Sequence, residues 1–186
     1  FPATGEILCE TTATSATVDH GTYRTVQLAD SFENRLGAII INNSAIGNGF
    51  TYDNCELKMS YPRGGIIKAG GTFKHCTFEN IGKAAIMASP EIVDTTFCES
   101  GYVNGLNLLY NDIKNTNLMH ALADKNSSIS IYGHSENIES GYAKHRDITI
   151  QGNRFENWGA HAIYIDSAEN VKILDNIFVD AAAYDD

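Results

Sequence analysis

Short apolar runs recur along the chain about every 21 residues. Each run ends in a polar residue, a spacer and a large apolar anchor, and the anchors are separated by 21, 19, 21, 37 and 23 residues. The six segments are 55–57, 76–78, 95–97, 116–118, 153–155 and 176–178. A fixed period of this length is typical of repeat architectures, in which each repeat packs on its neighbours. The 37-residue interval predicts one repeat that carries an insertion.

A second series of short runs lies in phase with the first. These runs begin with small residues, alternate apolar and polar positions, and cover 37–42, 65–70, 85–89, 105–110, 128–132 and 162–166. Alternation over four to six residues indicates strands with one buried face. Helical periodicity is nearly absent, and only 30–36 could form a short helical turn. We therefore predict an all-β fold, a parallel β-solenoid of about seven to eight coils.

The stacking of coils predicts two inner columns. The apolar anchors form one, and the residues two positions earlier form the other, which runs Cys, Cys, Thr, Thr, Asn, Asn. Asparagine in such a column can bond its amide to the next coil and so satisfy buried polar groups. Cys55 and Cys76 lie one coil apart; we favour free thiols, because parallel side chains fit a disulfide poorly, although a bridge stays open.

The repeat also suggests how the chain is organised. We expect one domain, with 1–36 as an irregular first coil or cap, 37–180 as repeating coils and 181–186 as a tail. Open ends of solenoids are normally covered. The sequence favours continuation of the helix in a longer chain, with a homo-oligomer or shielding by the tail as alternatives.

Composition narrows the partners. The chain has 186 residues, a formal net charge of −10 and 19% charged residues. An acidic surface repels phosphate backbones, so we expect no nucleic acid partner. No apolar run is long enough to span a membrane. The four cysteines form no Cys-x-x-Cys pair, and no Asp-rich loop has calcium-ligand spacing, so we expect neither a metal nor another cofactor.

The asparagine-containing segments 153–155 and 176–178, together with 159–166, resemble the right-handed parallel β-helix of the pectate-lyase-like superfold. The resemblance implies that substrate lies along one sheet, in a groove walled by loops. With alternate residues pointing inward, we expect one outward polar strip on the sheet that contains 162–166. Its members are Asn107, Ser130, Tyr132, His134, Tyr164 and Asp166. Such aromatic and polar side chains suit a sugar ring. Trp158, in the turn before this strand, could stack a sugar, although packing within the turn is slightly favoured.

A long insertion, 134–146, follows the strip and brings titratable groups beside it. Long loops next to a candidate site are often functional. Two chemistries compete. Glycoside hydrolysis needs two carboxylates, and the available acids are Asp112, Glu136, Glu139 and Asp166. Uronate β-elimination needs a base and charge neutralisation. The candidates for it are Lys68, Lys144, His145 and Arg146.

Further short stretches are similar to glycoside hydrolase family 110. They are 20–23 (His-Gly-Thr-Tyr), 63–67, 139–141 and 147–155. The resemblance implies an exo-acting α-1,3-galactosidase built on a β-helix. The family has Asp-Asp-Gly just before His-Gly-Thr-Tyr, whereas this chain has Thr14-Ser15-Ala16 there. The expected carboxylate pair is therefore missing from this position.

These observations predict a carbohydrate-active protein, most simply a glycoside hydrolase that acts on a poly- or oligosaccharide. Glu136 or Glu139 would work with Asp166 as acid and base. Tyr132, His134, Tyr164, Trp158, Asn107 and Arg146 would contact the sugar. A non-catalytic glycan-binding or structural module and a uronate lyase are the alternatives. We expect secretion or a periplasmic location.

Overall fold

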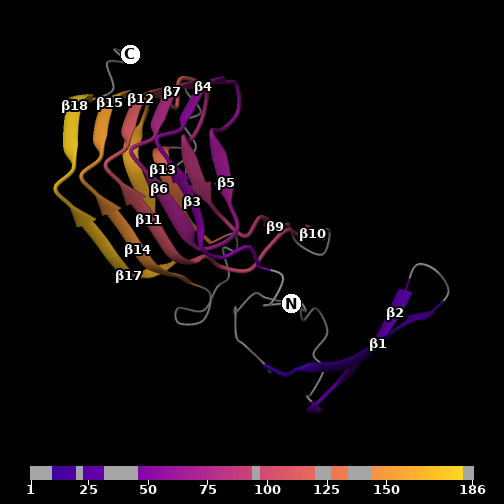
Figure 1. Cartoon of the computed structure of the whole chain (residues 1–186). Helices are drawn as coiled ribbons and strands as arrows, with labels where there is room; N and C mark the ends of the chain where they lie inside the picture. Colours follow the sequence, from indigo (N-terminus) through magenta and orange to yellow (C-terminus); the bar gives the residue numbers. More distant parts are fainter. Residues whose placement is uncertain are drawn as a thin grey trace.

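The computed structural model describes residues 10–19, 23–31, 46–93, 97–119, 127–133 and 144–181. These residues form strands and turns, and no helix occurs among them. A hairpin, β1 (Ala13–Asp19) and β2 (Tyr23–Leu28), is antiparallel and lies outside the main stack of strands (Figure 1). The predicted helical turn over 30–36 falls mostly outside the described residues.

The main body consists of three parallel sheets, here called sheets 1, 2 and 3. Sheet 1 contains β3 (Phe50–Asp53), β6 (Gly71–Lys74), β11 (Asn104–Leu109), β14 (His145–Gln151) and β17 (Ala168–Leu174). Sheet 2 contains β4 (Glu56–Ser60), β7 (Thr77–Ile81), β12 (Asp112–Thr116), β15 (Arg154–Trp158) and β18 (Ile177–Ala181). Sheet 3 contains β5 (Gly65–Ile67), β8 (Ile86–Ala88), β13 (Ser127–Ile131) and β16 (His161–Ile165).

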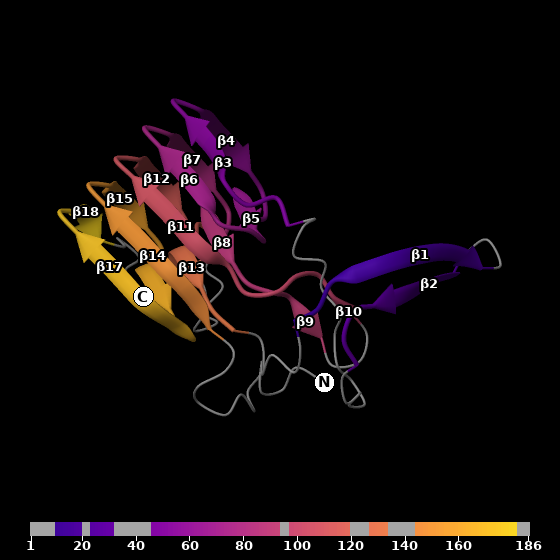
Figure 2. The ribbon, with the colours of Figure 1, turned by 60° about the horizontal axis from the view of Figure 1, so that its bottom comes forward.

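Successive strands of the chain visit the three sheets in turn, and each strand pairs with its equivalent one turn later (Figure 2). This all-β arrangement of stacked parallel strands is compatible with the predicted β-helix. The described residues supply five turns, fewer than the seven to eight expected. Part of the difference lies between β8 and β11, where the described residues do not make a full turn. They leave the stack and form the short antiparallel pair of β9 (Ile92–Val93) and β10 (Phe97–Cys98).

Two of the predicted anchors, residues 97 and 118, are wrong. Leu57, Phe78, Ile113, Phe155 and Phe178 occupy equivalent positions in sheet 2. Phe97 lies in β10, and residue 118 follows the end of β12, so neither is an anchor. The anchor pattern, a polar residue followed by a spacer and an apolar residue, also occurs at strand ends and turns. It therefore does not identify anchors uniquely. The segment 111–113, which carries the real third anchor, was not among those predicted.

The core lies between the three sheets and is filled by the inward residues of each strand. Leu106 and Leu108 of β11, Ile148 and Ile150 of β14, and Phe155 of β15 are fully buried. Burying one such side chain contributes roughly 1.5–3 kcal/mol. The last turn lacks a neighbour among the described residues, and there Ile173 and Phe178 are 49% and 50% exposed.

An asparagine ladder joins the turns at the corner between sheets 1 and 2. Oδ1 of Asn153 accepts hydrogen bonds from the backbone N–H and the Nδ2 of Asn111, both at 2.9 Å. Asn176 does the same for Asn153, at 2.9 and 3.0 Å. Asn153 Nδ2 also donates to the Leu108 carbonyl at 2.8 Å. The predicted turn-to-turn amide bonding is confirmed for Asn153 and Asn176, and Asn111 is a third member that the prediction missed.

A second set of asparagines follows the strands of sheet 2. Asn115 Nδ2 donates to Asn80 Oδ1 at 3.0 Å, and Asn157 Nδ2 donates to Asn115 Oδ1 at 2.8 Å. All three residues have positive φ, between 50° and 58°. Asparagine tolerates this left-handed conformation better than most residues. These side chains therefore both shape the bend and link one turn to the next.

Candidate functional site

The strands of sheet 3 end in a column of polar side chains. Ile67, Ala88, Ile131 and Ile165 are in register. The residues that follow them, Lys68, Ser89, Tyr132 and Asp166, therefore also stack. The backbone confirms this, because Tyr132 N–H donates to the Ala88 carbonyl at 3.1 Å and Asp166 N–H to the Ile131 carbonyl at 2.8 Å. Two predicted site residues, Tyr132 and Asp166, thus share one column.

Two carboxylates meet on Lys68 in this column. Lys68 Nζ donates to the Ser89 carbonyl at 2.9 Å and to Glu91 Oε2 at 2.9 Å, and it lies 3.2 Å from Glu99 Oε2. The side chains of Glu91, Lys68 and Glu99 are 18%, 26% and 48% exposed. Because both Oε2 atoms lie within 3.2 Å of one nitrogen, the two carboxyl groups are direct neighbours. Two neighbouring carboxyl groups are what glycoside hydrolysis requires.

The excursion between β8 and β11 positions both acids. The chain leaves β8 at Pro90, where Glu91 has a φ of 46° and its N–H donates to Ser89 Oγ at 3.2 Å. The excursion closes where Ser100 N–H donates to the Pro90 carbonyl at 3.2 Å. A non-glycine residue in the left-handed region is strained and persists where its surroundings hold it. Glu91 and Glu99 therefore flank the antiparallel pair and come back to the same lysine.

The pKa of Glu91 is lowered by its charged and hydrogen-bonding neighbours. Burial raises the pKa of Glu91, but hydrogen bonds from Lys68 and Glu99, together with the charges of Lys68 and Arg63, outweigh burial and lower it overall. Glu91 is therefore ionised at neutral pH. Glu91 and Glu99 are hydrogen-bonded to each other, so the two carboxyl groups interact directly as well as through Lys68.

Tyr132 forms the neighbouring wall of this cluster. It is half-buried, its hydroxyl donates to Met87 Sδ at 3.3 Å, and it is also hydrogen-bonded to Ser89. Burial raises the pKa of Tyr132, so the phenol stays protonated at neutral pH. The charges of Arg63 and Glu91 act on it in opposite directions. Tyr132 can thus present both an apolar ring and a hydroxyl beside the two carboxylates.

The structure places other predicted site residues on the same sheet. Tyr164 pairs in register with Ser130 and stacks on His161 with ring centroids 6.5 Å apart. Ser130 lies on the same face as Tyr164, as expected, but it is buried and so is not accessible to a ligand. Asp166 is exposed and accepts a hydrogen bond from Ser167 Oγ at 3.3 Å. Glu136, Glu139 and His134 lie outside the described residues.

Three predicted site residues lie elsewhere. Asn107 belongs to sheet 1, where it bonds to Thr72 at 3.5 Å, because 105–110 forms β11 and not a strand of sheet 3. Asp112 begins β12 in sheet 2 and so lies on a different sheet from Tyr132 and Tyr164. Trp158 is only 7% exposed and packs on Phe178 in the core, so it offers no free ring to a sugar.

The predicted basic run 144–146 is engaged in the structure. Arg146 Nε lies 2.7 Å from Glu169 Oε1, and Lys144 Nζ lies 3.6 Å from Glu169 Oε2. His145 is buried, accepts the Val103 N–H at Nδ1 and lies 3.1 Å from the Tyr132 carbonyl through Nε2. Burial lowers the pKa of His145, so the ring is neutral. These three residues tie strands together.

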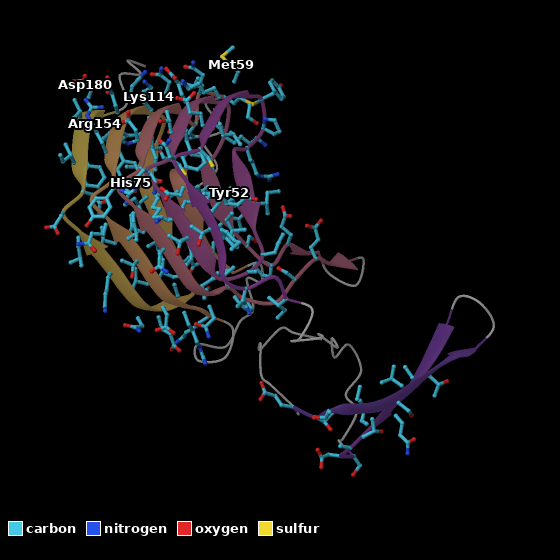
Figure 3. The ribbon with its side chains drawn as sticks, in the orientation of Figure 1. Tyr52, Met59, His75, Lys114, Arg154 and Asp180 are labelled. Carbon is cyan, nitrogen blue, oxygen red and sulfur yellow. The ribbon has the colours of Figure 1, made fainter. Side chains whose placement is uncertain are left out.

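The outer face of sheet 2 carries a different set of charges. Lys58 and Lys114 lie 3.5 and 3.4 Å from Glu79, and Arg154 lies 3.9 Å from Asp112. Arg154 also pairs with Glu156. Lys114 and Arg154 project outward from neighbouring strands (Figure 3). Each charge here is matched along or across the strands, as an ion-pair ladder.

Sequence reasoning missed Glu91 and Glu99, although a signal was present. Residues 95–97 fitted the anchor pattern, which made 90–103 look like an ordinary coil. The true anchors Phe78 and Ile113 are 35 residues apart instead of about 21. With Ile113 as the anchor, the 35-residue interval predicts an insertion at 90–103, just as the 37-residue interval predicts one at 134–146.

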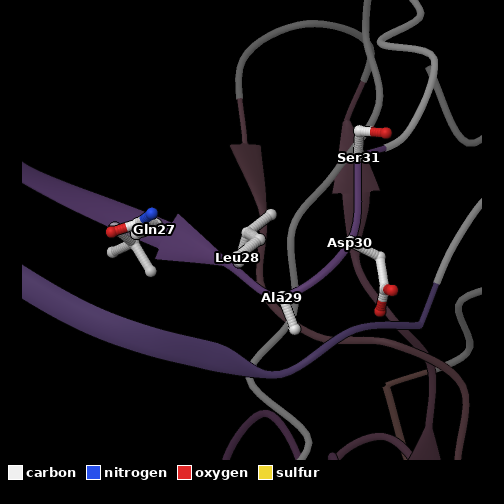
Figure 4. A pocket seen from close by; sticks show the side chains of 6 residues that line it. Gln27, Leu28, Ala29, Asp30 and Ser31 are labelled. Carbon is white, nitrogen blue, oxygen red and sulfur yellow. The ribbon is translucent and has the colours of Figure 1, made fainter.

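One shallow hollow in the described residues lies away from these acids. It is lined by Val26, Gln27, Leu28, Ala29, Asp30 and Ser31, which are consecutive residues at the end of β2 (Figure 4). Polar groups from separate elements do not converge on it. The hollow therefore lacks the enclosure that small-molecule sites usually have.

Among the described residues, no three His, Cys, Asp or Glu side chains are grouped so that they could hold a metal ion, and no helix is long and apolar enough to cross a membrane. Comparison of the chain with models of protein families, with curated proteins and with solved structures finds no match. The resemblance to the pectate-lyase-like superfold and to glycoside hydrolase family 110 therefore stays a prediction.

Proposed function

We propose that this chain is a carbohydrate-active protein with the right-handed parallel β-helix of the pectate-lyase-like superfold, and that it hydrolyses a glycosidic bond. The observation that carries this proposal is the pair of carboxylates, Glu91 and Glu99, held on Lys68 beside Tyr132. Two carboxyl groups at short separation are the catalytic requirement of most glycosidases. The parallel sheets and the asparagine ladder support the fold.

The environments of the two acids assign their roles. Glu91 is the more buried and has the lowered pKa, so it is the ionised group that acts as nucleophile or base. Glu99 is the more exposed, is hydrogen-bonded to Glu91 and reaches the leaving oxygen as proton donor. Lys68 holds both groups in place. In most glycosidases one carboxyl group is the acid and the other is the nucleophile or base.

The remaining outward residues of sheet 3 supply the sugar contacts. Tyr132 is adjacent to the acids, while Tyr164 and Asp166 lie one turn further along the same sheet. A sugar chain laid along the stacking direction would meet aromatic and polar groups in succession. We propose a poly- or oligosaccharide as substrate, no cofactor, and a secreted or periplasmic location.

The alternatives differ in the support they have. A non-catalytic glycan-binding or structural module is supported by the ion pairs that both acids form with Lys68. A uronate lyase is less supported. Among the described candidates for its base, Lys68, Lys144 and Arg146 are ion-paired and His145 is buried.

The test is a screen of the intact chain against defined oligosaccharides, α-1,3-galactosides included, followed by Glu91→Gln and Glu99→Gln on any substrate found. Each variant should lower kcat by about 10²–10⁴-fold. Glu156→Gln, on the outer face of sheet 2, is the matched control and should keep full activity. Binding without turnover would support the module. An unsaturated sugar product would support the lyase, and equal activity of all three variants would contradict the roles of Glu91 and Glu99.

A further inference from the structure

The thiols of Cys55 and Cys76 lie side by side at one end of the stack. The residues that follow them, Glu56 and Thr77, are in register, and Thr77 N–H donates to the Cys55 carbonyl at 2.9 Å. Adjacent strands are about 4.8 Å apart, within the ~4.4–6.8 Å Cα separation that a disulfide spans. The two thiol groups are also hydrogen-bonded to each other. Both are free in the structure.

The two thiols differ in accessibility. Cys55 is exposed, and its Sγ donates to the Asp53 carbonyl at 3.5 Å. Cys76 is only 2% exposed, and its Sγ lies 3.4 and 3.3 Å from the carbonyls of Tyr52 and Lys74. Burial raises the pKa of the Cys76 thiol. An exposed thiol beside a buried one is the arrangement in which one sulfur is attacked and the other resolves it.

The pair also occupies a special place in the ladder. Asn111, Asn153 and Asn176 fill this column in the later turns and bond each turn to the next. Cys76 N–H still donates to Asn111 Oδ1 at 2.9 Å. Between the first two turns the Cys76 thiol replaces the amide, and its Sγ lies 3.4 Å from the Tyr52 carbonyl of the preceding turn. A covalent bond between the sulfurs would join the turns at the same position.

We propose that Cys55 and Cys76 form a thiol–disulfide exchange site whose substrate is a low-molecular-weight disulfide such as oxidised glutathione. The Cys55 thiolate attacks one sulfur of the disulfide, the S–S bond breaks, and one glutathione leaves and takes up a proton. The Cys76 thiol then loses its proton and attacks the Cys55 sulfur, which expels the second glutathione. Two protein thiols are oxidised to one disulfide, and one glutathione disulfide is reduced to two thiols.

Peptide mapping of the full chain tests this proposal. Trypsin places Cys55 in the peptide 36–58 and Cys76 in the peptide 75–83. A Cys9→Ser/Cys98→Ser background removes the other two thiols. After incubation with oxidised glutathione and alkylation of free thiols, the two peptides should be recovered joined, and dithiothreitol should separate them. The step order is tested by Cys76→Ala, in which the glutathione adduct should remain on Cys55.

The Cys55→Ser variant is the matched control, because Cys76 alone should stay unmodified in the folded chain. Circular dichroism of each variant checks that it is folded before oxidation. Recovery of separate peptides after oxidation of the folded chain would overturn the proposal. So would an adduct on Cys55 that persists while Cys76 is present, or first modification at Cys76. These outcomes do not depend on whether the chain acts on carbohydrate.

Discussion

The outer faces of sheets 2 and 3 carry the same kinds of charged side chains in different arrangements. On sheet 2, Lys58, Glu79 and Lys114 come from equivalent positions of successive turns and neutralise one another. On sheet 3, Glu91 and Glu99 come from an excursion and meet on one lysine. Register alone produces the first pattern. The second pattern requires a break in the repeat. Charged side chains therefore cluster around one lysine where the repeat is interrupted.

The largest effect on stability should come from the buried ladder that keeps both faces in register. Asn153→Ala removes the acceptor of the Asn111 N–H and Nδ2 and two donated bonds. Buried groups left without partners should lower the free energy of unfolding by about 2–4 kcal/mol in urea melts. Asn157→Gly is the matched control, since glycine accepts the left-handed backbone, and should cost about 1 kcal/mol or less. Equal losses of unfolding free energy in the two variants would show that the ladder of Asn111, Asn153 and Asn176 contributes no more to stability than the asparagines of sheet 2.

The two faces should respond differently to the loss of a lysine. In Lys68→Met, Glu91 loses its main charged partner while its burial remains, so the pKa of Glu91 should rise. Ionised Glu91 contributes stability above the unfolded pKa, near 4.5, and this contribution is lost as the pH falls. NMR titration of the glutamate carboxyl carbons measures the change. Lys114→Met on sheet 2 should leave Glu91 unchanged, and a similar shift in both variants would refute the local cause.

His145 begins β14 of sheet 1, and its Nε2 lies 3.1 Å from the Tyr132 carbonyl at the end of the sheet 3 strand β13. Its pKa is lowered by burial, so the unfolded chain binds the proton more readily. Its contribution to stability is therefore complete above about pH 6.5 and falls as the pH drops below that value. Between pH 7.5 and 5.5, the free energy of unfolding of His145→Gln should fall by roughly 1 kcal/mol less than that of the original chain, as measured by urea unfolding. An unchanged pH profile would assign the loss to other groups.

The smallest effect should come from the ion-pair ladder itself. Lys114→Ala removes one contact to Glu79, but Lys58 still pairs with that carboxylate at 3.5 Å. Because these side chains are partly exposed, the change in unfolding free energy should be at most about 0.5 kcal/mol and should shrink in salt. A salt-independent loss above about 1 kcal/mol would mean that this face is more than a solvated surface.

The repeat was predictable from the sequence, but its phase was not. Runs 128–132 and 162–166 do form paired strands of one sheet, and Tyr132, Tyr164 and Asp166 lie on it as expected. Run 105–110 has the same alternation yet belongs to sheet 1, because alternation reports a buried face and not which of three sheets the strand joins. Trp158 could not be assigned inward from its own identity, since a large aromatic suits a core and a sugar equally.

The excursion that carries Glu91 and Glu99 begins and ends within hydrogen-bonding distance of itself, at Pro90 and Ser100. Its two ends are thus anchored while the turns on either side keep their pairing. In evolutionary terms, such a segment can vary in length or composition independently of the rest of the fold. Variation there would change what the face of sheet 3 binds, and selection could act on it without disturbing the stacked turns.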